Sequence, residues 1–219
     1  MFTSMRFSFI CFIRSLRYCA QLIRGMRVLK HLQQPVICVF GGAEAQQESQ
    51  HYQQAFAFAQ RLASKGVSVV TGGGPGVMQA ANCGAAKGKP QGATYTNSLG
   101  IAVHGIDEHI EPACASMVYV DMFFQRKWLL VQQAAAVVVF PGGLGTADEL
   151  FYLLNLYKHH RLPRVPILLV DRAFWGPLVQ WIKESAFSAG YVQADYLDFF
   201  DVVDSIDEAY EVLAKQMPI

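Results

Sequence analysis

The chain has 219 residues, of which 53% are hydrophobic, enough for one large domain with an ample buried core. Its formal net charge of +1 excludes a chain that binds a nucleic acid along its whole length. The cysteines are odd in number and lack metal-ligand spacing, so we expect free thiols, no metal site and a reducing, cytoplasmic location. They are Cys11, Cys19, Cys38, Cys83 and Cys114.

A basic segment opens the chain, and we predict that residues 1–34 form an extension to a domain of residues 35–219. All six of its Lys and Arg residues precede the first acidic residue, Glu44. Apolar residues at positions 9, 12, 13, 16, 20 and 23 recur on one helical face. We expect a basic amphipathic helix that covers its own domain or a sister subunit. Contact of residues 6–30 with a membrane surface is the less favoured alternative.

Strands and helices are predicted to alternate from residue 35 onward, because short apolar runs alternate with longer segments of helical periodicity. The predicted strands are residues 36–40, 67–70, 99–103, 117–120, 137–140, 165–170 and 199–203. The predicted helices are residues 48–65, 77–87, 121–134, 146–158, 174–189 and 205–217. This order predicts an α/β fold, a doubly wound parallel sheet that is Rossmann-like, with three α/β/α layers and an N-terminal helical extension.

Two further expectations concern segments outside the strands. Residues 104–116 carry mixed charge and no periodicity, and we predict that they form a mobile loop beside the site. Trp175 and Trp181 lie in a predicted helix and are expected to pack into the core.

The stretch from Ala134 to Leu150 predicts the centre of the site. A buried strand ends at Pro141, and a glycine loop leads to Thr146, a plausible helix N-cap, with Glu149 three residues later as in a capping box. A glycine loop before a helix start brings backbone amides close to an anion such as a phosphate. Glu149 either caps the helix or has a chemical task beside that anion.

A second glycine loop, Thr71–Gly76, is expected at the same carboxyl edge of the sheet. Neither loop has the Lys-Ser/Thr pair of a P-loop, and neither completes the dinucleotide fingerprint GxGxxG. A mononucleotide-type site remains. Arg126 and Lys127 follow a predicted strand at this edge, where an arginine can bind a phosphate through two hydrogen bonds.

Three motifs carry a resemblance to the Lonely Guy (LOG) family, whose members are often labelled lysine decarboxylase-like. They are Gly72–Met78, Phe123–Lys127 and Pro141–Glu149, which read GGGPGVM, FFQRK and PGGLGTADE. The middle motif is similar to the FFxRK branch of the family. The resemblance implies hydrolysis of a nucleoside 5′-monophosphate, AMP or an N6-substituted cytokinin form, to free base and ribose 5-phosphate. It also implies a homodimer, without a cofactor or a nucleic-acid partner.

The same resemblance implies the site residues. Arg126 and Glu149 would be the catalytic pair. The residues that would bind substrate and its phosphate are Gly73, Gly74, Gly76, Met122, Lys127, Gly142, Gly143, Gly145 and Thr146.

There are two alternative functions. A non-catalytic nucleotide sensor or carrier on the same fold is the main alternative, although a pure binder has little need of the Glu149 carboxylate. Lysine decarboxylation is disfavoured, because it requires pyridoxal phosphate on a lysine and no lysine has a suitable context.

Overall fold

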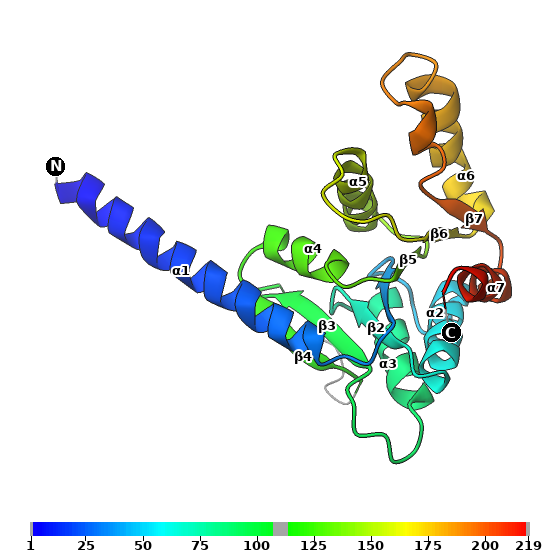
Figure 1. Ribbon diagram of the computed structural model, residues 1–219, viewed down its shortest axis with the longest axis horizontal. Helices are drawn as coiled ribbons and strands as arrows, with labels where there is room; N and C mark the ends of the chain where they lie inside the picture. Colours follow the sequence, from blue (N-terminus) through cyan, green and yellow to red (C-terminus); the bar gives the residue numbers. More distant parts are fainter. Residues whose placement is uncertain (1, 107–113, 218–219) are drawn as a thin grey trace.

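The computed structural model describes residues 2–106 and 114–217, with side chains from residue 10 onward, and is built on a seven-stranded parallel sheet. The predicted fold class is confirmed (Figure 1). The strands are β1 Val36–Phe40, β2 Ser68–Thr71, β3 Ser98–Val103, β4 Ser116–Val120, β5 Ala136–Val139, β6 Ile167–Val170 and β7 Asp201–Val203. Their order in the sheet is β4-β3-β2-β1-β5-β6-β7. Of the predicted loop 104–116, the structure describes residues 104–106 and 114–116. The predicted mobility concerns residues 107–113, which lie outside the described residues.

Helices cover both faces of the sheet, so the protein has three layers. The helices are α1 Phe2–Lys30, α2 Gln50–Ser64, α3 Val77–Gly88, α4 Phe123–Val131, α5 Leu144–Lys158, α6 Arg172–Gln180 and α7 Ile206–Gln216. One buried cluster joins the sheet to α1, α4, α5 and α6, and a second joins it to α2, α3 and α7. The central strands are buried on both sides, which explains their continuous apolar sequences.

The direction of strand order reverses between β1 and β5. Parallel sheets bind ligands at such a point, in the crevice beyond the carboxyl ends of the two strands. The loops that leave these strands are hydrogen-bonded to each other, since the Gly42 amide donates to the Pro141 carbonyl over 3.0 Å. The topology therefore places the glycine loop after β5 at the expected ligand-binding edge.

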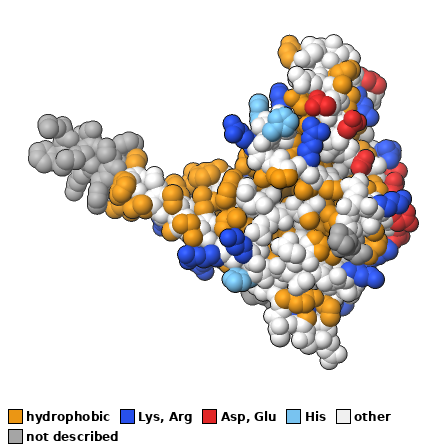
Figure 2. Space-filling view, viewed as in Figure 1, with side chains coloured by type: hydrophobic (Ala, Val, Ile, Leu, Met, Phe, Trp, Pro, Cys, Tyr) orange, Lys and Arg blue, Asp and Glu red, His pale blue; other side chains and the backbone are white. Residues whose placement is uncertain are grey.

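The first helix covers its own domain only in part, and its contact with a sister subunit stays a prediction. Its carboxyl half packs on α4 and β4, and Gly25 lies so close to Leu129 that a Cβ atom there would be 2.6 Å from the leucine side chain. Its amino half extends away from the body of the protein (Figure 1), and hydrophobic side chains are exposed on its described part (Figure 2). The predicted apolar face does not cover the domain, because Phe12 and Leu16 are more than half exposed. The covering face is instead the one that carries Leu29. No described helix is long and apolar enough to cross a membrane.

Two further predictions were wrong. Cys83 of α3 and Cys114 form a disulfide bond rather than two free thiols, because the fold brings the end of the 104–116 loop onto α3. Their separation of 31 residues gives no sign of this proximity. Trp175 packs in the core as predicted, but Trp181 is half exposed, at the point where α6 continues as a π-helix, Trp181–Ala186.

Candidate functional site

The helix after β5 begins closer to the glycine loop than predicted. α5 starts at Leu144, and its N-cap is Gly143, so Thr146 is a buried residue of the first turn and not the cap. A Cβ atom on Gly142 would be 2.7 Å from the Gly42 amide nitrogen and would also collide with Thr146. Only glycine fits at this crossing, which leaves the first amides of α5 open toward the cavity.

Glu149 does not cap the helix. It lies in the second turn of α5 and is 6% exposed, and its side chain faces Arg126 of α4, which is 8% exposed. The Arg126 Nη2 and Glu149 Oε1 atoms are 3.4 Å apart. Burial and then the charge of Glu149 raise the pKa of the Cys38 thiol well above its ordinary value, so Cys38 is a neutral neighbour of the carboxylate. The fold thus holds an ion pair in a largely dry setting.

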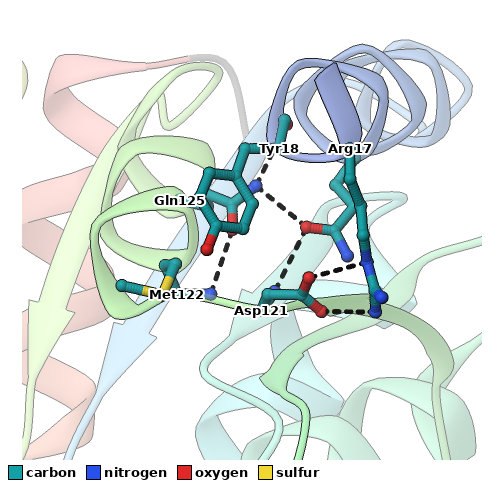
Figure 3. Close-up of polar contacts among 6 residues, drawn as sticks. Arg17, Tyr18, Asp121, Met122 and Gln125 are labelled. Atoms are coloured by element: carbon teal, nitrogen blue, oxygen red, sulfur yellow. Dashed lines mark hydrogen bonds and ion pairs between the residues drawn. The ribbon is translucent and has the colours of Figure 1, made fainter. Parts of the chain in front are cut away.

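Gln125 fixes the start of the helix that carries Arg126. Gln125 is completely buried, and its Oε1 atom accepts a hydrogen bond from the Met122 amide over 3.0 Å. Its Nε2 atom donates to the Tyr18 carbonyl and to Gln21 Oε1, both over 3.0 Å. Both of these partners belong to α1 (Figure 3). The buried amide group is therefore satisfied only when α1 lies against α4.

A second pair of contacts strengthens this junction. Arg17 binds the Asp121 carboxylate, with its Nε atom 2.7 Å and its Nη2 atom 2.8 Å from the two oxygens (Figure 3). The Asp121 amide donates to Gln21 Oε1 over 3.2 Å. The segment between β4 and α4 is thus held by the first helix, although no sequence pattern predicted that this helix lies near Arg126 and Glu149.

The buried pair faces a cavity of about 640 Å³, within the usual range for small-molecule sites. Six of the predicted site residues line it: Arg126, Glu149, Gly142, Gly143, Gly145 and Thr146. Gly73, Gly74, Gly76, Met122 and Lys127 do not line it.

Two of the predicted residues that do not line the cavity, Gly76 and Lys127, lie near it. Gly76 has a φ of 64°, and a Cβ atom on it would collide with the carbonyl groups of Gly42 and Ala43. Gly76 therefore packs directly against the backbone of two residues that line the cavity. Lys127 lies at the surface, where its Nζ atom is 3.0 Å from Asp148 Oδ2.

Sequence reasoning did not assign the remaining residues of the cavity lining to the site. They are Gly41–Ala45, His51, Met78, Pro141 and Phe174. The glycine pair that ends β1 was a usable signal, because β1 neighbours β5 at the reversal of strand order. No signal linked His51 to Phe174, which belong to helices more than 120 residues apart.

His51 is held by an acidic residue at the start of α6. Its Nε2 atom is 3.0 Å from Asp171 Oδ2, and Asp171 Oδ1 accepts a hydrogen bond from the Phe174 amide over 3.1 Å. Burial raises the pKa of Asp171, but its hydrogen bonds with His51 and with backbone amides outweigh this and lower it overall. Asp171 is therefore ionised and can orient the imidazole ring.

The arrangement suits an anionic ligand with a polar reacting centre. Glycine-loop amides and the N-terminus of α5 favour a phosphate, and a buried carboxylate and guanidinium lie beside it. Among the described residues, no group of three His, Cys, Asp or Glu side chains could hold a metal ion.

The chain matches one family model and is similar in sequence to proteins that act on nucleotides, as their names state. The family model described as possible lysine decarboxylase matches residues 78–213. A pyrimidine/purine nucleotide 5′-monophosphate nucleosidase of Escherichia coli (strain K12) is 31% identical over 224 aligned positions, covering 90% of this chain and 44% of that protein. A cytokinin riboside 5′-monophosphate phosphoribohydrolase of Rhodococcoides fascians is 27% identical over 151 positions, covering 68% of this chain and 75% of that protein.

A solved structure extends the likeness in fold. The molybdenum cofactor binding protein from Rippkaea orientalis superposes with a TM-score of 0.59 at 20% identity, covering 84% of this chain and 98% of that one. At this identity the likeness concerns the fold alone. The chain spans less than half the length of the E. coli relative.

Proposed function

The chain belongs to the family described as possible lysine decarboxylase, the LOG family that its motifs resemble, and on that premise we propose that it is a phosphoribohydrolase. The proposed substrate is a nucleoside 5′-monophosphate, AMP or an N6-substituted AMP, and the products are the free base and ribose 5-phosphate. The observation that carries the proposal is the buried Arg126–Glu149 pair beside the open amides of α5. The names of the E. coli and R. fascians relatives support the same reaction class.

The geometry suits cleavage of an N-glycosidic bond. The amides that follow Gly143 would hold the 5′-phosphate, which places the sugar over Glu149. When the bond from C1′ to the base nitrogen breaks, its electron pair leaves with the base, and the sugar becomes cation-like. The Glu149 carboxylate stabilises that charge and accepts a proton from the water that adds to C1′, while the base gains a proton. Arg126 orients Glu149 and neutralises charge on phosphate or base.

Lysine decarboxylation is poorly supported by this site. The chemistry requires a lysine that can form a Schiff base with pyridoxal phosphate. Within the described chain, none of the residues that line the cavity is a lysine, and the nearby Lys127 pairs with Asp148 outside it.

The proposed activity predicts release of a free base. Purified protein incubated with AMP, isopentenyl-AMP, CMP or GMP is expected to release the base from at least one of them, detected by chromatography, because the cavity offers both a phosphate site and a carboxylate. The variant Glu149→Ala serves as the control and is expected to release none. If wild type releases no base from any nucleotide while AMP still binds, the proposal is wrong and the protein is a nucleotide sensor or carrier.

The homodimer and the cytoplasmic location stay predictions. An apolar hollow of about 270 Å³ lies between α5 and the segment after α6, and it supports an interface on that side. Tyr191 at its edge is 82% exposed, and Trp181 is 52% exposed. Large exposed aromatic residues around a hollow are typical of protein interfaces.

A further inference from the structure

The cavity has a buried floor and an exposed mouth. Arg126 and Glu149 form the floor, and both are less than a tenth exposed. Phe174 lines the mouth and is 46% exposed, and the His51 side chain beside it is 31% exposed. The mechanism proposed above uses the floor and the glycine loop, and it leaves these two side chains without a task.

The backbone of Asp171, beside the mouth of the cavity, has a strained conformation. Its φ of 81° is in a region that residues other than glycine rarely adopt, and such strain gathers at functional sites. The strained conformation lets one carboxylate serve two elements. One oxygen caps α6 at the Phe174 amide, and the other binds His51 of α2. The carboxylate thus ties the backbone at Phe174 to the His51 imidazole, so both residues are held at the same side of the cavity.

A half-exposed phenylalanine at a cavity mouth is a suitable surface for stacking an aromatic base. Phenylalanine side chains usually bury most of their apolar surface. A base stacked on the exposed ring would remove that surface from water. The His51 ring, with Nε2 engaged by Asp171, has Nδ1 to offer to a ligand. A ring that stacks and a neighbouring polar nitrogen match the two recognition features of a nucleobase, its flat face and its hydrogen-bonding edge.

We propose that His51, Asp171 and Phe174 form the nucleobase subsite of the cavity, with Phe174 stacked on the base and His51 hydrogen-bonded to its edge. This inference rests on the proposed function only for the identity of the ligand as a nucleoside 5′-monophosphate. Asp171 is a positioning residue, because it acts through the other two. The phosphate and sugar of the ligand lie on the floor side, so loss of the subsite leaves their binding intact.

The test compares two ligands that differ only by the base. AMP and ribose 5-phosphate are titrated calorimetrically into the full chain carrying Glu149→Gln, which is expected to slow turnover by at least about a hundredfold in every sample. Adding Phe174→Ala is expected to weaken AMP binding about tenfold or more, and adding His51→Ala about fivefold. Neither change is expected to alter ribose 5-phosphate binding by more than about twofold.

Matched and conservative variants complete the design. Phe187→Ala removes a phenylalanine of similar exposure outside the cavity and is expected to leave both affinities unchanged. Phe174→Tyr keeps the ring and is expected to keep AMP binding, which guards against a misfolded Phe174→Ala protein.

The outcomes separate this inference from the function itself. The proposed subsite is wrong if His51→Ala and Phe174→Ala weaken the binding of AMP and of ribose 5-phosphate equally, or if they leave AMP binding unchanged. If wild type hydrolyses no nucleotide yet these variants selectively weaken AMP, the subsite stands and the proposed hydrolysis fails.

Discussion

Replacing Glu149 by glutamine is expected to lower kcat between about a hundredfold and ten-thousandfold while nucleotide binding changes by less than about threefold. Glutamine keeps the size of the side chain and an oxygen that Arg126 Nη2 can approach, so the 6%-exposed site can keep its packing. It lacks the negative charge and the basicity that the proposed mechanism assigns to Glu149, which would stabilise the sugar cation and take a proton from water. Single-turnover rates of base release and calorimetric affinity for AMP measure the two effects separately.

The neighbouring carboxylate provides the control. Asp148 precedes Glu149 in the same helix, but its side chain is 63% exposed and pairs with Lys127 at the surface. Asp148→Asn also removes one negative charge, and it is expected to leave kcat within about twofold of wild type. If Glu149→Gln turns over at the wild-type rate, or if both variants lose activity equally, the role assigned to Glu149 is wrong.

Replacing Arg126 by alanine is expected to abolish activity and also to destabilise the fold, by about 3 kcal/mol in the free energy of unfolding. The reason is that Glu149 would remain as a buried carboxylate without the guanidinium that offsets its loss of hydration. Denaturant unfolding, monitored by circular dichroism, measures the change. The equivalent surface change, Lys127→Ala, breaks an ion pair at 20% and 63% side-chain exposure and is expected to cost less than about 1 kcal/mol.

A double variant separates stability from catalysis. In Arg126→Ala/Glu149→Gln no buried charge is left uncompensated, so we expect most of the lost stability to return while activity stays absent. If Arg126→Ala unfolds at the same denaturant concentration as wild type, the pair contributes nothing to stability, and the electrostatic account of the floor is wrong.

Local sequence patterns were sufficient for the sheet and for the floor of the site. The run Val137–Phe140 and the glycine loop after it predicted a buried strand that leads to an anion site, because both features depend on neighbouring residues. The N-cap was misplaced by three residues, at Thr146 instead of Gly143, because Gly143 caps α5 without a side-chain hydrogen bond. Glycine caps have a weak sequence signature, whereas a threonine followed by a glutamate suggests a capping box.

The remaining features depend on contacts between distant segments. His51 and Asp171 are 120 residues apart, and Gln125 finds its partners in α1 more than 100 residues earlier. Periodicity indicates which face of a helix is apolar, but it cannot choose between two apolar faces. For α1 the tertiary fold selected the face of Leu29 and left Phe12 exposed, since Gly25 allows close approach only on the former side.

The contact between the first helix and α4 has a consequence for the order of assembly. The residues that satisfy Gln125 are synthesised before it, because they precede it by about a hundred residues. The long segment between them must close before the Gln125 side chain can reach Tyr18 and Gln21, and such closure slows the formation of a contact in folding. The first turn of α4, which carries Arg126, therefore gains these hydrogen bonds only after two distant segments of the chain have met.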